Sequence, residues 1–140
     1  MVTFCSTCLP HFLKNILLTN GNLCVTLLSM IIIKEYIDSN DRSPYAKWFN
    51  RLNAPAAARV VTAVVRMEQG NLSNVKGIGG GGGVLECRID FGPGYRVYFG
   101  RDGDRIIILL GGGTKKRQKK DIEVAKALWK EYKKRKRQET

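Results

Sequence analysis

The pattern of apolar and polar residues between positions 84 and 110 predicts three β-strands. Residues 84–91 alternate with a period of two, so one face carries Leu85, Cys87, Ile89 and Phe91 and the other carries Glu86, Arg88 and Asp90. Residues 95–99 alternate as well, and the short Gly92–Gly94 linker favours a hairpin. A nearly continuous apolar run at 105–110 predicts a central strand. We therefore expect Arg88 and Arg96 to emerge together on one sheet face, beside Tyr98.

The flanking segments predict a further strand and three helices. Residues 30–37 are rich in strand-forming residues, Ser43-Pro44 is a helix-start signal, and Asn53 can cap a second helix. The apolar stripe of that second helix is formed by Val60, Val61, Val64, Val65 and Met67. Residues 71–83 predict a mobile loop, and residues 118–137 a last helix with Ile122, Ala125, Trp129 and Tyr132 on one face. The order β-α-α-β-β-β-α predicts an α+β domain with a small, mostly antiparallel sheet packed with helices.

The charge of the chain points to a polyanionic partner. It has 24 Lys and Arg residues against 12 Asp and Glu residues, and 12 of the basic residues lie between Gly112 and the C-terminus. Contacts to phosphate release counterions and dominate nucleic-acid affinity, so such clustering favours nucleic acid. The competing interpretation is a solvated helix face that keeps a small protein soluble.

The segment GYRVYFGRDGDRIIILLGGGTKKRQKKDI, preceded by ECRIDFG, resembles the RelE/ParE toxin superfamily in its HigB-like, phage-derived addiction-module-killer branch. The resemblance runs from about Met30 to Arg137. It implies a cytoplasmic, ribosome-dependent mRNA endoribonuclease without a cofactor, held silent by a small DNA-binding antitoxin. It also implies catalytic roles for Arg96, for Lys115 or Lys116 after the GGGT turn, and less directly for Arg88. Studied RelE proteins carry a catalytic Tyr at the start of the last helix, where this chain has Asp121.

Excluding other nuclease mechanisms from the residues present also leads to metal-independent RNA cleavage. The single histidine, His11, excludes a pair of catalytic histidines, and Glu86 and Asp90 are interleaved with Arg88 instead of clustering for a metal. What remains is a metal-independent attack by the RNA's own 2′-hydroxyl, with cations holding the phosphate. A lysine or Tyr98 would move the protons. Lys76, Arg117, Lys119 and Lys120 are candidates for RNA binding. Alternatively, Arg88 pairs with Glu86 or Asp90 in an ion network without a catalytic role.

Residues 1–29 differ from the rest, with three of the four cysteines, one lysine and no acidic residue. We expect them to lie outside the domain at 30–140, as upstream or poorly ordered sequence with Met30 as the true start; the alternative is a functional leader. Their apolar runs are far shorter than the roughly 18 residues of a membrane span. The residues Cys5, Cys8, His11 and Cys24 match no standard zinc spacing, so we expect no metal site.

The sequence thus predicts the toxin of a type II toxin–antitoxin system, acting on ribosome-bound mRNA. The antitoxin would cover or distort the basic face, and the pair would repress its own operon. Two other functions stay open from the sequence alone. One is a ParE-like toxin that poisons DNA gyrase by protein–protein contact, and the other is a non-catalytic domain that binds nucleic acid or a partner.

Overall fold

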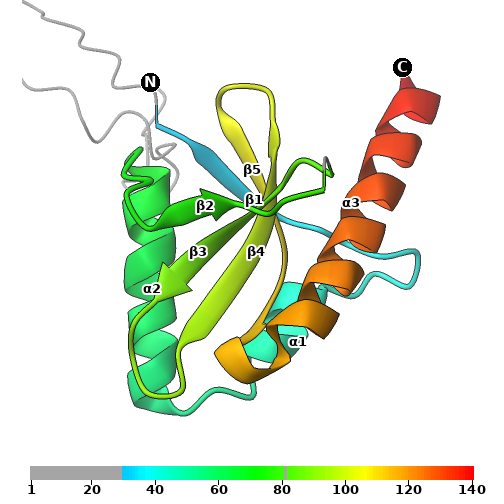
Figure 1. The fold of residues 1–140 in the computed structure, drawn as a ribbon. Helices are drawn as coiled ribbons and strands as arrows, with labels where there is room; N and C mark the ends of the chain where they lie inside the picture. Colours follow the sequence, from blue (N-terminus) through cyan, green and yellow to red (C-terminus); the bar gives the residue numbers. More distant parts are fainter. Residues whose placement is uncertain (1–29, 81) are drawn as a thin grey trace, which may run out of the picture. The chain divides into compact units, whose positions relative to one another are not determined.

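The computed structural model describes residues 30–80 and 82–140 (Figure 1). Its elements are β1 (Ile32–Glu35), α1 (Pro44–Phe49), α2 (Ala54–Glu68), β2 (Val75–Gly77), β3 (Val84–Ile89), β4 (Tyr95–Asp102), β5 (Ile106–Thr114), the 3₁₀ turn η2 (Lys115–Arg117) and α3 (Gln118–Glu139). The predicted α+β class is confirmed. The order contains one strand more than predicted, β-α-α-β-β-β-β-α.

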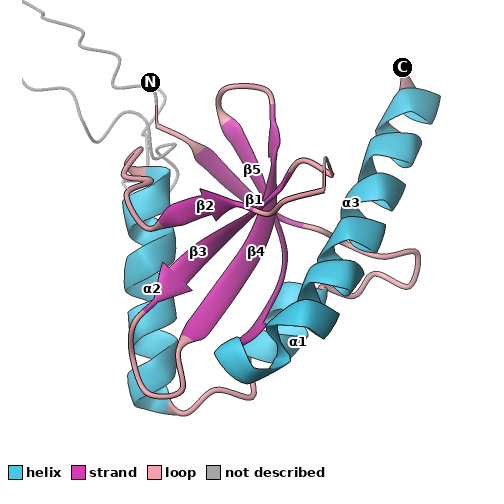
Figure 2. Ribbon diagram, in the orientation of Figure 1, coloured by secondary structure: helices cyan, strands magenta, loops and turns pink. Residues whose placement is uncertain are grey.

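The strands form one five-stranded sheet in the order β1-β5-β4-β3-β2 (Figure 2). Only β1 is parallel to its neighbour, β5, and the other pairs are antiparallel. The predicted hairpin is confirmed, with Arg88 directly opposite Arg96. The predicted loop at 71–83 is wrong in part, because β2 lies within it and pairs along the edge of β3. A strand of three residues next to glycines is too short to show a period of two.

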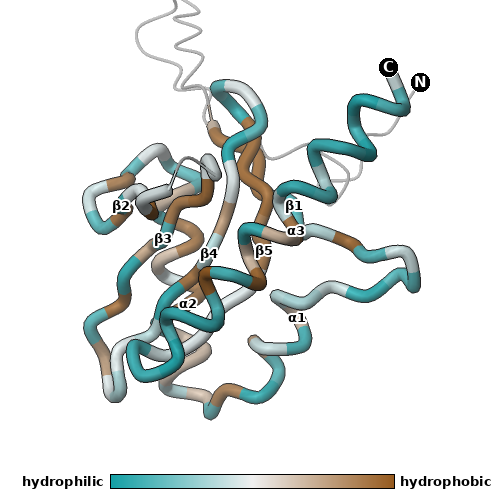
Figure 3. Tube along the Cα trace, turned by 45° about the vertical axis from the view of Figure 1, so that its right-hand side comes forward, coloured by the Kyte–Doolittle hydropathy of each residue, from teal (hydrophilic) through white to brown (hydrophobic). Residues whose placement is uncertain are grey.

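The helices cover the two faces of the sheet separately. On one face, α1 and α2 pack on the larger core, which includes Val60, Met67, Val97, Phe99 and Ile107. On the other, α3 covers a smaller core that includes Tyr36, Tyr98, Leu110, Ala125 and Trp129. In Figure 3 the apolar first half of β5 is brown at the centre of the sheet, and α3 is largely hydrophilic. The polar face predicted for β3 and β4 is therefore not open to solvent along its length.

Both predicted helix starts are confirmed by side-chain caps. The backbone N–H of Ala46 donates to Ser43 Oγ at 3.0 Å, and that of Ala56 donates to Asn53 Oδ1 at 2.9 Å. The stripe predicted for α2 is narrower than expected, because Val61 and Val65 are exposed. These caps fix where α1 and α2 begin, and hence how they meet the sheet.

Glycines in β4 and β5 let aromatic side chains approach the backbone. A Cβ at Gly100 would lie 2.5 Å from the Trp129 ring, and a Cβ at Gly112 would overlap the Trp48 ring. Each glycine is therefore required where an indole packs flat on a strand. The contact between Trp129 and Gly100 packs α3 against β4, and the contact between Trp48 and Gly112 packs α1 against β5.

The predictions for residues 1–29, including the four candidate metal ligands there, lie outside the described residues. Within residues 30–80 and 82–140, no helix is both long and apolar enough to cross a membrane.

Candidate active site

The candidate site lies on the face of the sheet that α3 covers, where two rows of residues cross the strands. Directly opposite residues of antiparallel strands share a face. One row runs through Lys76, Glu86, Tyr98 and Gly111. The next row runs through Arg88, Arg96 and Gly113. The structure thus brings together Arg88, Arg96 and Tyr98, which the sequence nominated from two predicted strands, and Lys76, which it nominated from a predicted loop.

Glu86 neutralises one of the two adjacent arginines. Its side chain is buried, and its Oε1 accepts a hydrogen bond from Arg88 Nε at 2.7 Å and forms an ion pair with Arg88 Nη2 at 2.7 Å. Its Oε2 accepts from Gln118 Nε2 at 2.8 Å. The pairing of Arg88 with Glu86, which the sequence left open, is therefore present. Because Arg88 stays 38 % exposed, the pair holds the guanidinium in place and still leaves it in reach of a ligand.

Arg96 is the cation without a counter-charge. It is only 7 % exposed, its Nε is buried without a hydrogen-bond partner, and it forms no ion pair with any described residue. Arg88, a like charge, lies opposite. A nearly buried, unpaired guanidinium destabilises a fold unless an anion compensates it. This position therefore has the charge and the unused donors to bind an anion such as phosphate.

Tyr98 is on the predicted face, but it does not form an exposed aromatic platform. It is 1 % exposed, because α3 covers it, and its hydroxyl has no partner among the described residues. Burial, and then the negative charges of Glu86 and Asp121, raise its pKa to about 12. The phenol therefore keeps its proton at neutral pH, which makes Tyr98 a poor proton acceptor.

Asp121 is a site residue that sequence reasoning did not select. Its Oδ2 is buried without a partner among the described residues and lies directly over Gly113, where a Cβ would overlap it. Burial raises the pKa of this carboxyl, against the opposing effects of Arg117 and Lys120. Since Gly113 is the cross-strand partner of Arg96, Asp121 and Arg96 flank the same glycine. The only signal in the sequence was its place at the start of the last helix.

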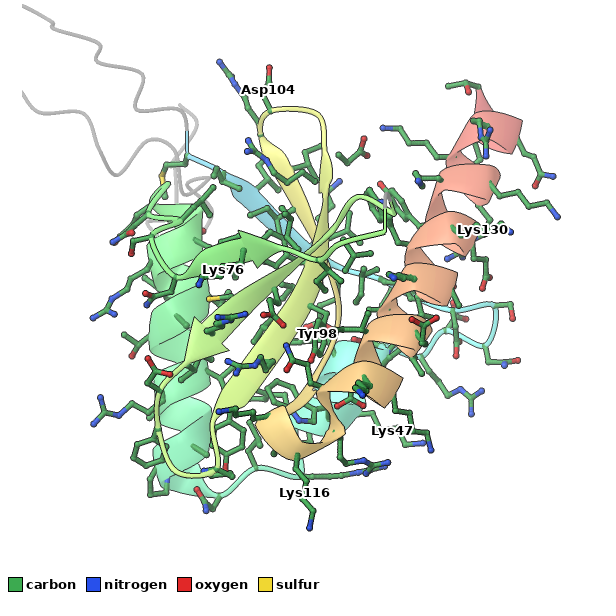
Figure 4. The ribbon with its side chains drawn as sticks, viewed as in Figure 1. Lys47, Lys76, Tyr98, Asp104, Lys116 and Lys130 are labelled. Carbon is green, nitrogen blue, oxygen red and sulfur yellow. The ribbon has the colours of Figure 1, made fainter. Side chains whose placement is uncertain are left out.

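The predicted lysines and Arg117 surround this site as exposed cations. Those at 115–117 form η2, and the Lys115 N–H donates to Gly94 O at 2.8 Å, which fixes this turn beside the start of β4. Lys119 and Lys120 follow in the first turn of α3, and Lys116 points away from the sheet in Figure 4. Lys76 lies on the edge strand β2 and not on a flexible linker.

The site offers cations to bind an anion and two groups, Asp121 and a lysine, that can exchange protons. In the described part of the chain, no group of three or more His, Cys, Asp or Glu side chains gathers where a metal ion could bind.

Comparison with known proteins identifies the family. Residues 47–130, which contain the whole site, match the model of the phage-derived Gp49-like proteins (DUF891). The chain belongs to this family. A Haemophilus influenzae protein, described only as uncharacterized, is 39 % identical over 85 residues, which are 60 % of this chain and 84 % of that protein.

Proposed function

We propose that this protein is the toxin of a type II toxin–antitoxin system and cleaves mRNA on the ribosome. The observation that carries the proposal is Arg96, a nearly buried guanidinium with an unpartnered Nε beside Arg88. Membership of a phage-derived family agrees with the phage-derived toxin branch that the sequence resembles. The net charge of +12 supports an RNA substrate.

The arginines would bind the scissile phosphate. Arg96 has unused donors at the surface of the core, and Glu86 holds Arg88 beside it. Planar guanidinium groups bind phosphate oxygens through two parallel hydrogen bonds. As the 2′-oxygen attacks phosphorus, negative charge grows on those oxygens, and fixed cations stabilise it without reorganisation.

Two proton transfers complete the reaction. The ribose 2′-OH gives its proton to the Asp121 carboxylate as the new O2′–P bond forms, and the raised pKa of Asp121 makes it a better acceptor than an ordinary aspartate. The P–O5′ bond breaks, and the leaving 5′-oxygen takes a proton from Lys115 or Lys116 at the rim. The products are a 2′,3′-cyclic phosphate and a 5′-hydroxyl. Tyr98, with its pKa raised to about 12, would at most donate a hydrogen bond.

The ribosome and an antitoxin are the expected partners. The cations of η2 and of the first turn of α3 are exposed and unpaired within the described residues, so they suit ribosomal RNA as well as mRNA. A small antitoxin would silence the protein by covering this basic surface, and the pair would repress its own operon.

The test is cleavage of a defined mRNA, mapped by primer extension, with and without purified ribosomes. We expect cuts within the translated frame when ribosomes are present and much slower cutting without them, because the site holds few proton-transfer groups of its own. Intact mRNA together with gyrase-dependent DNA breaks would contradict the proposal and support a ParE-like toxin. Binding of RNA or ribosomes without any cleavage would support a non-catalytic domain.

A further inference from the structure

A second basic pocket lies beside the site, between α1, the end of β5 and the start of α3. Its volume is about 350 Å³, and its lining includes Lys47, Arg51, Arg117 and Asp121. It opens at the edge of the sheet, because β1 pairs with β5 only from Ile106 to Leu109. No strand of the described chain covers β5 beyond that point on this side, so the Gly112–Thr114 backbone forms the pocket wall.

The three cations of this pocket come from separate places and have no partner. Lys47 belongs to α1, Arg51 to the turn after it, and Arg117 to η2. All three are exposed, and among residues 30–80 and 82–140 none of them forms an ion pair or donates a side-chain hydrogen bond. These three cations outnumber the one carboxylate of the pocket, Asp121, so an anion that neutralises the remaining positive charge binds favourably.

The start of α3 adds to the positive potential. Arg117 is its N-cap, and no side chain of the described residues caps its first turn. The first amide groups of a helix and its dipole attract anions. Lys119 and Lys120 lie at this same end of α3. Positive charges at the N-terminus of a helix oppose its dipole, and a bound anion would compensate them.

Asp121 makes the pocket less suited to a bare anion. It is the only acidic residue of the lining, and its Oδ2 has no hydrogen-bond donor in the described chain. A carboxylate repels phosphate but accepts a hydrogen bond from a hydroxyl. A ligand with a phosphate for the three cations and a neighbouring hydroxyl for Asp121 satisfies both groups. A ribonucleotide has this combination, and a deoxyribonucleotide lacks the 2′-hydroxyl.

We propose that this pocket is a second phosphate subsite for a single strand of RNA, continuous with the Arg96 position. The inference rests on the proposed function. Gly113 joins the two places, since Arg96 is its strand partner and Asp121 lies over it. The nucleotide that Asp121 engages through its 2′-hydroxyl has its 3′-phosphate at Arg96 and Arg88. Its 5′-phosphate is bound by Lys47, Arg51 and Arg117.

The test compares two double variants of the full chain. Lys47→Ala with Arg51→Ala removes two pocket cations four residues apart. Lys130→Ala with Lys134→Ala removes two exposed cations of α3 at the same spacing, and Figure 4 shows Lys130 far from Lys47. Affinity for a fluorescein-labelled 12-nucleotide RNA is measured by anisotropy over a salt series. Thermal unfolding shows that each variant is folded.

We expect the pocket variant to bind the RNA about tenfold more weakly than the control variant, and to lower the salt slope by about 0.7 for the one phosphate that the pocket binds. Wild-type protein should prefer the RNA over DNA of the same sequence. Equal losses in the two double variants would overturn the subsite. Binding of inorganic phosphate alone, with no preference for the RNA, would overturn the assignment to an RNA strand.

Cleavage of ribosome-bound mRNA separates this inference from the proposed function. If wild-type protein cleaves and the two double variants bind alike, only the subsite fails. If wild-type protein neither cleaves mRNA nor binds the RNA, the proposed function fails and the subsite with it.

Discussion

Glu86→Gln tests how much a buried carboxylate stabilises the fold by holding Arg88 in its place opposite Arg96. Glu86 is buried, accepts one hydrogen bond from Arg88 Nε and one from Gln118 Nε2, and forms an ion pair with Arg88. Removing one partner of a fully buried ion pair costs about 3–5 kcal/mol. Arg88 is 38 % exposed, so water screens part of its charge, and we expect a loss of about 2 kcal/mol of unfolding free energy. In a domain of this size that corresponds to a fall in Tm of about 10 °C.

The assay is urea unfolding at pH 7, followed by circular dichroism, with Asp90→Asn as the control. Asp90 is an exposed acid that directly follows the end of β3 and has no ion pair within the described residues. Its substitution should change the unfolding free energy by less than about 0.5 kcal/mol. A double-mutant cycle with Arg88→Gln then isolates the coupling between the pair. Equal unfolding free energies for Glu86→Gln and Asp90→Asn would refute this account of the site.

Three further substitutions probe other contacts. Gly112→Ala should cost about 1–3 kcal/mol of unfolding free energy because the new methyl overlaps Trp48, whereas Gly111→Ala, with open space at its Cβ, should be tolerated in the same thermal scan. The pKa of Asp102 is lowered by Lys136 and then by Tyr132, so Asp102→Asn should cost about 1 kcal/mol at pH 7, and the difference should vanish in acid as the wild-type carboxyl protonates. Asp121→Asn should be more stable than wild type at pH 7, because burial raises the pKa of the carboxyl, and calorimetry should show the gain shrink as the pH falls toward 3.8. A gain for Asp121→Asn that does not change with pH would contradict that cause.

The strands and helices of this protein were largely predictable because their signals are local. The alternation in 84–99 gave the hairpin and placed Arg88 opposite Arg96, and Ser43 and Asn53 marked two helix starts. Alternation identifies which residues share a face, but not what covers that face. For this reason the burial of Tyr98 and Arg96 beneath α3 was not foreseen.

The rest of the site could not be predicted because it depends on tertiary contacts between distant segments. Lys47 in α1 and Arg51 in the turn after it lie more than 60 positions before Arg117 in η2, and no spacing rule joins them. Gly113 carries no side chain and so no periodic signal, although it places Asp121 beside the strand partner Arg96. Within the described residues, strand β2 was missed because three residues are too few to show alternation.

The proposed function requires that Arg96 binds the scissile phosphate in the transition state. The direct measurement is the single-turnover rate of mRNA cleavage on saturating ribosomes by Arg96→Ala and Arg96→Lys, with Arg105→Ala as the control. Arg105 is exposed next to Asp104, which Figure 4 shows at the opposite end of the sheet from Lys116. Arg96→Lys keeps the charge and most of the buried volume. A slow rate in this variant therefore cannot be attributed to unfolding alone.

We predict that Arg96→Ala cleaves about a hundredfold more slowly than wild type, the consequence of losing about 3 kcal/mol of transition-state stabilisation. Arg96→Lys should also be slow, because a point charge cannot form two parallel hydrogen bonds to phosphate. Arg105→Ala should cleave at the wild-type rate. Equal rates for folded Arg96→Ala, Arg96→Lys and Arg105→Ala would show that Arg96 does not take part in the reaction.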